Sequence, residues 1–393
     1  MSLKRRQLLI LGGLALGSGS GILVQRVFSR VRFNPTLSES AAIAANSQTL
    51  TAAIAETLPS HPAPAGMYAP QSGDVRLVVI SDLNSRYGST SYRAEVEKAV
   101  QIIPDWRPDL VICGGDMIAG QSASLSRADI QAMWNAFGEK IFTPIRRAGL
   151  PFAFTLGNHD ASSIFSQGRY LYAQEREEAD AFWNHPQRDL GLEFVDRAGY
   201  PFYYSFEQNE IFYLVWDASS ADVPDEQITW AERSLASDTA QNAKLRIVLG
   251  HLPLYAIAQG RDRAGEILNQ ADALRSLLER RRVHTYICGH HHAYFPGYAG
   301  KLQLLHCGAL GNGPRPWLGS ADAAIHTLTV VDISLDSQST VYTTYNMGTR
   351  QVVDESRLPQ QIIGPNGRVL RRDISWETLT PTEQNQQYTP SAF

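Results

Sequence analysis

The stretch Val75-Arg76-Leu77-Val78-Val79-Ile80-Ser81-Asp82-Leu83-Asn84 joins a nearly continuous apolar run to an acidic residue. The apolar part has the length of a strand, and its unbroken hydrophobicity is typical of a strand buried on both faces. Asp82 then stands where this strand ends. A carboxylate buried alone at such a position would be costly, so a bound cation is the better explanation for it.

Further groups of polar residues stand at comparable places along the chain. They are Gly114-Gly115-Asp116, Gly157-Asn158-His159-Asp160, and His251 followed by Gly289-His290-His291-His292. Carboxylate and amide oxygens and imidazole nitrogens all bind divalent cations. In an extended segment His290 and His292 share one side and His291 faces the other. Three consecutive histidines after a glycine are hard to explain by packing alone.

The elements around these groups alternate in type. Strands are expected over residues 75–80, 110–113 and 152–156, separated by helices over residues 91–103 and 127–148. This alternation predicts parallel strands with helices packed on the sheet. Because the carboxyl ends of neighbouring parallel strands lie side by side, Asp82, Asp116 and Asn158 are expected to converge on one crevice.

The second half of the chain is richer in strands. A polar and aromatic stretch over residues 161–199 is expected to be a covering insertion, and a hairpin over residues 203–216 follows it. Beyond it, helices are predicted at 225–236 and 271–282, and strands at 245–249, 283–288, 302–306, 324–333 and 340–345. We expect an α/β fold of two stacked sheets with helices outside, in one domain over residues 73–350. Residues 351–393 lose periodicity and are interpreted as a C-terminal extension and loose tail.

The first residues carry a targeting pattern. Lys4-Arg5-Arg6-Gln7-Leu8-Leu9 opens an apolar stretch over residues 8–24 and resembles a twin-arginine export signal, which bacteria use for folded proteins. Residues 1–32 are therefore interpreted as an export signal or, alternatively, a membrane anchor. The expected location is periplasmic or extracellular, or anchored facing outside, with membrane contact through this segment left open. Residues 33–72 are rich in Ala, Ser, Thr and Pro, which predicts a flexible linker.

Composition limits the class of protein. With 44% hydrophobic and 19% charged residues, the chain is an ordinary globular protein. A net charge of −4 gives no general attraction to nucleic acid, which rewards a concentrated basic surface. Cys113, Cys288 and Cys307 each end an apolar run before glycine, as small buried residues do. A Cys113–Cys288 disulfide is the alternative for an exported protein. The sequence does not indicate an oligomeric state.

The polar groups, taken together, resemble a known family. Asp82-x-Asn84, Gly115-Asp116, Gly157-Asn158-His159-Asp160, Gly250-His251 and Gly289-His290-x-His292 stand in the order and spacing of the calcineurin-like metallophosphoesterases. Purple acid phosphatases and cyclic-nucleotide phosphodiesterases are relatives of this family. The resemblance covers roughly residues 73 to 333. It implies a four-layer α/β/β/α sandwich of two mixed sheets, with a two-metal site at the carboxyl ends of strands.

The resemblance also implies roles for these residues. One divalent cation would be held by Asp82, Asn84, Asp116 and His292, and the other by Asp116, Asn158, His251 and His290. A hydroxide between the two cations would attack phosphorus in line. His159, oriented by Asp160, would stabilise the transition state or protonate the leaving oxygen of a small phosphomonoester or phosphodiester. Arg86, Tyr87, Ser89 and Tyr92 either contact the substrate phosphate or form a solvated turn.

Asn84 departs from the family pattern, which has histidine at this place. An amide oxygen is a harder and weaker donor than imidazole, so the preference for zinc should fall relative to manganese or magnesium. The identity of the cations thus stays open among Mn, Fe, Zn and Mg. Ala119 occupies the place of the tyrosine that gives purple acid phosphatases their colour, so that iron chemistry is not expected. The competing interpretation is a metal- or phosphate-binding protein of the same fold with weak catalysis.

Overall fold

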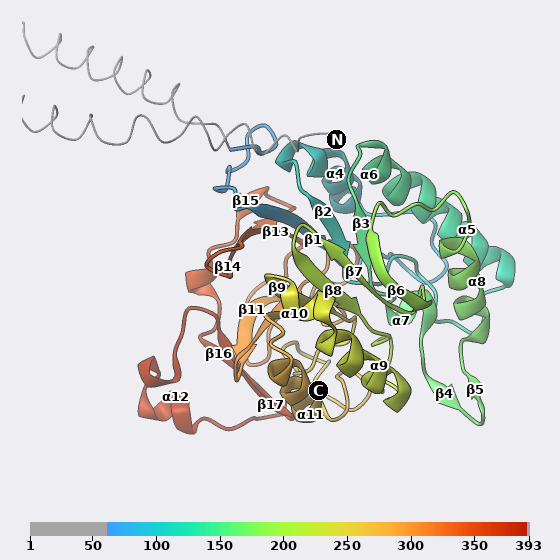
Figure 1. The fold of residues 1–393 in the computed structure, drawn as a ribbon. Coiled ribbons are helices and arrows are strands. Elements are labelled where there is room, and N and C mark those ends of the chain that lie inside the picture. Colours follow the sequence, from blue (N-terminus) through green and yellow to red (C-terminus); the bar gives the residue numbers. More distant parts are fainter. Residues whose placement is uncertain (1–60, 391–393) are drawn as a thin grey trace, which may run out of the picture. The chain divides into compact units, whose positions relative to one another are not determined.

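The computed structural model describes residues 61–390 (Figure 1). The expected export signal or anchor over residues 1–32, and the linker up to residue 60, lie outside the described residues. Between residues 61 and 390, none of the helices has the length and apolar character needed to cross a bilayer.

The first sheet has six strands in the order β15-β14-β13-β1-β2-β3. The strand β1 lies at its centre, parallel to β2 and antiparallel to β13. All six residues of β1 are buried, as the continuous apolar run predicted. The strands of this sheet are β1 (Val75–Ile80), β2 (Leu110–Cys113), β3 (Phe152–Phe154), β13 (Thr327–Ser334), β14 (Ser339–Asn346) and β15 (Gln351–Val352).

The second sheet has nine strands in the order β16-β17-β11-β12-β10-β9-β8-β7-β6. The pairs β8–β9, β9–β10 and β10–β12 are parallel and the outer pairs antiparallel, so this sheet is mixed like the first. Its strands are β6 (Glu193–Gly199), β7 (Tyr203–Gln208), β8 (Ile211–Val215), β9 (Leu245–Leu249), β10 (Thr285–Cys288), β11 (Tyr294–Ala299), β12 (Leu302–Cys307), β16 (Gln361–Gly364) and β17 (Gly367–Arg371).

Helices cover the outer faces of the two sheets. In Figure 1, α4, α5, α6 and α8 gather on the side of the first sheet, and α9, α10 and α11 on the side of the second. The helices are α4 (Ala94–Ile102), α5 (Arg127–Phe137), α6 (Thr143–Arg147), α7 (Asn158–Ala161), α8 (Ala173–Trp183), α9 (Asp225–Ala236), α10 (Asp238–Asn242), α11 (Ala271–Arg280) and α12 (Pro381–Asn385). The expected two-sheet α/β sandwich is confirmed.

The helix predicted over residues 127–148 is interrupted. A π-helical turn, Gly138–Phe142, separates α5 from α6. Pro144 stands in the first turn of α6 and has no backbone N–H to donate to the preceding turn. The wider turn accommodates that missing hydrogen bond.

The described structure extends the packed domain beyond the bounds expected from the sequence at both ends. Part of the flexible linker, from residue 61, packs on the domain, because the Arg76 guanidinium donates to the carbonyls of Pro62 and Pro70. The expected loose tail contains β16 and β17, and β17 pairs with β11 at the edge of the second sheet. Backbone pairing and the burial of Ile362 and Val369 in the core hold this part of the C-terminal extension.

The insertion over residues 161–199 contributes three pieces of structure. A short hairpin of its own, β4 (Phe165–Ser166) and β5 (Arg169–Tyr170), extends from the body in Figure 1. It is followed by α8 and by β6, which forms the edge of the second sheet. The side chain of Arg176 in α8 connects the insertion to the domain. It donates to the Ala161 carbonyl at 2.7 Å and to Asp217 Oδ2 at 2.8 Å.

The three cysteines are free and buried. Each is the last residue of its strand, β2, β10 or β12. The interpretation as small packing residues at strand ends is confirmed, and the alternative disulfide is not formed.

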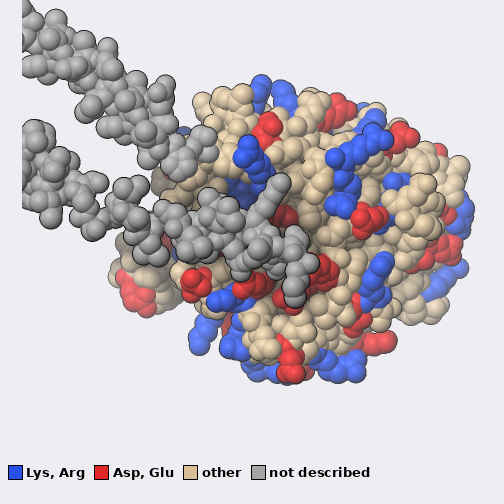
Figure 2. Space-filling model, turned by 45° about the horizontal axis from the view of Figure 1, so that its top comes forward, with Lys and Arg blue, Asp and Glu red and all other residues tan. Residues whose placement is uncertain are grey.

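The surface carries charges of both signs. On the face shown in Figure 2, lysine and arginine side chains lie among aspartate and glutamate side chains. Some of the charges pair, as Arg146 does with Asp189 at 3.1 Å, and such exposed pairs contribute about 0 to 1 kcal/mol each. The stability of the domain therefore comes chiefly from its sheets and their core.

Candidate metal centre

Asp82 and Asp116 lie just beyond β1 and β2, where the chain turns sharply. Both have left-handed backbone conformations, with φ of 53° and 55°, and both are buried. The turns are joined by backbone hydrogen bonds, from Asp82 N to Gly115 O at 2.9 Å and from Leu83 N to Asp116 O at 2.8 Å. The two carboxylates from neighbouring strands are thus held at one place.

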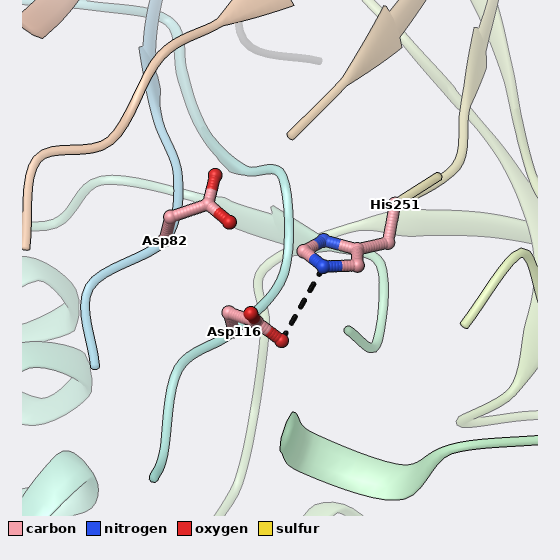
Figure 3. A group of neighbouring side chains, drawn as sticks. All are labelled: Asp82, Asp116 and His251. Carbon is pink, nitrogen blue, oxygen red and sulfur yellow. Dashed lines mark ion pairs between the residues drawn. The ribbon is translucent and has the colours of Figure 1, made fainter. Parts of the chain in front are cut away.

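His251, after β9 in the other sheet, completes a compact group with these carboxylates. One ligand atom from each of Asp82, Asp116 and His251 lies within 4.8 Å of the others (Figure 3). One of these contacts, drawn as a dashed line, joins His251 Nε2 to Asp116 Oδ1 at 3.4 Å. The sequence-predicted residues of the two sheets therefore meet at one edge of the sandwich.

Asn158 and His290 lie on one side of this group. The amide oxygen of Asn158 is 3.0 Å from His251 Nε2 and 2.8 Å from His290 Nδ1. The Asn158 amide nitrogen donates to Gln121 Oε1 at 2.6 Å, which fixes the amide oxygen toward the histidines. Asn158 thus presents an oxygen ligand between two imidazoles.

His292 lies on the other side, beside Asp82. Its Nε2 is 3.2 Å from Asp82 Oδ1. His291 faces away from the centre, where its Nδ1 accepts from Ile257 N and its Nε2 contacts the carbonyl of Glu266. The expected orientation is found, but the segment is not extended, because His290 and His292 have left-handed backbone conformations. The triple histidine therefore supplies two residues to the site and one to the packing beneath it.

Each imidazole of the site has one ring nitrogen that faces the centre, called the inner nitrogen, and one that faces away from it, called the outer nitrogen. The outer nitrogens of His251 and His292 contact the carbonyls of Gly114 and Gly313, each at 2.8 Å. Since a carbonyl can only accept, these nitrogens carry the proton, and in the neutral ring the inner nitrogen presents its lone pair to the centre. An outer N–H held by a carbonyl or carboxylate is the usual arrangement of metal-binding histidines.

Two buried atoms at the centre lack a hydrogen-bond partner among the described residues. They are Asp116 Oδ2 and His292 Nε2, the latter close to Asp82 without hydrogen-bond geometry. Gly157 lets the chain pass so close that a Cβ at this position would lie 2.1 Å from Asp116 Oδ1. Buried polar atoms are normally satisfied. The donor set and these unsatisfied atoms fit divalent cations.

The pKa shifts of these side chains determine which of them are in a protonation state that binds cations. Burial raises the pKa of Asp82, but the neighbouring His292 outweighs it and lowers that pKa overall. Asp116 behaves alike, with His251 as the main lowering charge. Burial lowers the pKa of His290 to about 4, so this ring is neutral at pH 7. Both carboxylates and the His290 imidazole are therefore in the forms that bind metals. Burial lowers the pKa of His251, but the charge of Asp116 outweighs it and raises that pKa to about 9, so this ring must release a proton when it binds a cation.

His159 borders the centre, but Asp160 does not hold it. Nδ1 of His159 contacts the Gly120 carbonyl at 2.9 Å, and its Nε2 lies 4.0 Å from Asp116 Oδ2. The carboxylate of Asp160 instead accepts from the backbone N–H groups of Met117, Ile118 and Gly157. The prediction that Asp160 orients His159 is wrong, because the buried carboxylate braces two loops and a carbonyl orients the ring.

Two cavities flank the centre. The arginine cavity, of about 420 Å³, is lined by Asn84, Arg86, Tyr87, His159, His292 and Arg315, among others. The hairpin cavity, of about 660 Å³, is lined by Asn158, His290 and residues of the β4–β5 hairpin.

Of the residues expected to reach substrate from the loop after Asp82, Arg86 and Tyr87 line the arginine cavity. The Tyr92 hydroxyl instead donates to Met117 O at 2.9 Å. Asn84 is buried and borders the arginine cavity.

The sequence did not reveal Glu266 and Gln121. Glu266 Oε2 lies 2.9 Å from His290 Nε2. Burial raises the pKa of Glu266, but His290 and Arg261 outweigh burial and lower that pKa overall. Gln121 fixes the Asn158 amide. Both residues lie in irregular loops, where no periodicity or motif spacing marks them. An acidic residue in a loop next to two arginines, Arg261 and Arg263, was the one available signal.

Comparisons with known proteins agree with this geometry. The calcineurin-like phosphoesterase family matches residues 75–294. A probable purple acid phosphatase of Arabidopsis thaliana is 24% identical over 227 residues, 57% of this chain and 47% of the relative. The chain thus spans about half the length of the curated relative that it matches.

The solved structures to which the chain is similar share little sequence with it. A dimetal phosphatase from Danio rerio is 13% identical, with a TM-score of 0.45, over 67% of this chain and 93% of that one. GAP50, described as the anchor in the inner membrane complex of Plasmodium, is 16% identical, with a TM-score of 0.43, over 71% and 87%. The match over residues 75–294, more than half of the sequence, is decisive: this chain belongs to the calcineurin-like phosphoesterase family.

Proposed function

We propose that this protein hydrolyses a small phosphate ester with two divalent cations. Asp82, Asn84, Asp116 and His292 would hold one cation, and Asp116, Asn158, His251 and His290 the other. The observation that carries the proposal is the position of Asp116. Its Oδ1 lies 3.4 Å from His251 on one side, and its Oδ2 is buried without a hydrogen-bond partner. A carboxylate placed in this way can serve two cations.

The bound cations would lower the pKa of a bound water molecule and neutralise charge on the phosphoryl oxygens. The chain itself supplies the proton handling. Because Nδ1 of His159 donates to the Gly120 carbonyl, its Nε2 is the nitrogen that faces the centre. Protonated there, His159 can donate to the leaving oxygen, the role of a general acid. Arg86 and Tyr87 border the same cavity, where they can contact phosphoryl oxygens.

The test is metal analysis combined with turnover. The full chain is loaded with Mn, Fe, Zn or Mg and assayed with p-nitrophenyl phosphate and bis(p-nitrophenyl) phosphate. We expect two equivalents of metal and turnover of at least one substrate, both lost in Asp116→Asn. Asp189→Asn, on an exposed carboxylate paired with Arg146, is the matched control and should behave as wild type. One bound metal and no turnover with any cation would favour the weakly catalytic binding protein.

We also propose that the chain is exported or anchored outside the cytoplasmic membrane by the twin-arginine route. The support is the Arg5-Arg6 pair before the apolar residues 8–24. In a bacterial host, replacing both arginines by lysine should retain the protein in the cytoplasm, as cell fractionation would show. Equal export of the variant would contradict this proposal.

A further inference from the structure

The hairpin cavity is open beside the proposed second cation, and no step of the hydrolysis uses its outer part. Asn158 and His290 line its inner end, and Ile164, Phe165 and Tyr170 of the hairpin line it farther out. Its volume of about 660 Å³ lies in the range of small-molecule sites. A group attached to a phosphate at the centre can therefore extend into this space.

The hairpin is unusually apolar for an exposed segment. Phe165 is 62% exposed, and Ile164, Tyr170 and Leu171 are also large exposed apolar residues within the same eight residues. The guanidinium of Arg176 covers one face of the Tyr170 ring at 4.2 Å, whereas Phe165 meets Tyr170 edge to face at 5.3 Å between ring centroids. The Phe165 ring thus remains open to a ligand, and clustered exposed apolar side chains commonly mark binding sites.

Several polar side chains of this cavity already have partners within the protein. Ser163 and Ser220 hydrogen-bond each other at 2.7 Å, and the Asn269 amide donates to Asp222 at 2.6 Å. Arg261 pairs with Glu266, which contacts His290. Among the described residues, Arg261 is the one lysine or arginine that lines the cavity; its charge is paired with Glu266, although its buried Nε has no hydrogen-bond partner, and the exposed apolar surface of the cavity is the hairpin.

We infer that the hairpin cavity binds the alcohol portion of the substrate, and that this portion is an uncharged group bearing an aromatic or similarly flat apolar ring. The inference rests on the proposed phosphoesterase function and names its substrate class. The phosphoryl group lies at the metal centre, and the ring packs against Phe165. Its occupant is a small molecule because the cavity is continuous with Asn158 and His290, two residues of the centre.

The experiment compares benzyl phosphate with methyl phosphate, whose leaving alcohols have similar acidity. With the Mn-loaded full chain we expect kcat/KM to be at least about ten-fold higher for benzyl phosphate. Phe165→Ala should remove most of this preference and leave methyl phosphate within about two-fold. Leu171→Ala is the matched control, because Leu171 is 59% exposed on the same hairpin and is not among the residues lining the cavity. Phe165→Leu should be intermediate.

Equal kcat/KM for the two esters in the wild type would overturn the inference while leaving the phosphoesterase function in place. So would a loss in Leu171→Ala that matches Phe165→Ala. If neither ester is hydrolysed, calorimetric binding of benzylphosphonate and methylphosphonate decides about the cavity, and the proposed function fails only if the two p-nitrophenyl esters are not hydrolysed either. Tighter binding of benzylphosphonate that Phe165→Ala abolishes would then support it, and equal binding would refute it.

Discussion

Nε2 of His290 lies 2.9 Å from Oε2 of Glu266, and the same carboxylate pairs with Arg261. The contact holds the proton of the neutral ring on Nε2 and leaves Nδ1, 2.8 Å from the amide oxygen of Asn158, free to bind a cation together with that oxygen. Glu266 thus orients a proposed ligand without reaching the centre itself. Glu266 lies in the loop between β9 and α11, outside any helix or strand.

Glu266→Gln should weaken metal binding about 10- to 100-fold, as loss of a residue that orients a ligand usually does. The amide can still accept a hydrogen bond but can also present N–H₂ to the ring, which removes the constraint on its proton. Titration with Mn²⁺ by calorimetry measures the effect. Glu232→Gln, at a part-exposed carboxylate 2.9 Å from Arg281, is the control. Wild-type affinity in Glu266→Gln would refute the orienting role.

His159→Ala should lower kcat about 10²- to 10⁴-fold for methyl phosphate, because its leaving oxygen needs a proton. The loss should be smaller for p-nitrophenyl phosphate, whose leaving group departs as an anion. Metal content, measured by mass spectrometry, should stay at the wild-type value, since His159 is not a proposed ligand. An equal loss for both substrates would argue against proton donation by this ring.

Asn84→His should raise the relative affinity for Zn²⁺ over Mn²⁺, because imidazole is a softer donor than an amide oxygen. Competition between the two cations, followed by metal analysis, measures the ratio. Asn312→His, at another asparagine of the arginine cavity, tests whether any histidine there has the same effect. An unchanged ratio in Asn84→His would show that residue 84 does not bind a cation.

Arg76→Met should destabilise the domain by about 3 to 5 kcal/mol, because it leaves Asp332 buried without its charge partner. The two side chains are 4% and 3% exposed and 2.8 Å apart. Urea denaturation gives the free energy of unfolding. Lys244→Met removes the exposed pair with Asp336 and should change it by less than about 1 kcal/mol. Similar losses in both variants would contradict the importance of burial here.

The sequence predicted the elements that carry strong patterns. The strand Val75–Ile80 and the helix Asp225–Ala236 have the predicted bounds, because a long apolar run and a clear helical period each depend on local sequence. The strand Tyr294–Ala299 was missed, since Pro296 and Gly297 interrupt its pattern, and its pairing with β12 and β17 becomes apparent only in the folded structure. β6 was also missed, because this edge strand is largely exposed and polar.

The candidate site was predictable in its ligands and less so in its surroundings. Asp82, Asp116 and His251 converge as parallel strand ends require. Asp160 was misassigned because its neighbour in sequence, His159, is not its partner in space. Glu266 depends on a loop whose path the sequence does not indicate. A residue that orients another side chain, as Glu266 orients His290, has no fixed spacing in the sequence by which it could be recognised.

The left-handed conformations at Asp82, Asp116, His290 and His292, with φ between 53° and 64°, place two demands on the same four positions. Aspartate and histidine tolerate this conformation better than most side chains, and both also bind cations. Glutamate or cysteine would keep a donor atom but fit the backbone less well. An alanine scan would therefore confuse loss of a donor with backbone strain, whereas glycine at these positions removes the donor without that strain. Redesign of the site for another metal is limited by the backbone as much as by coordination chemistry.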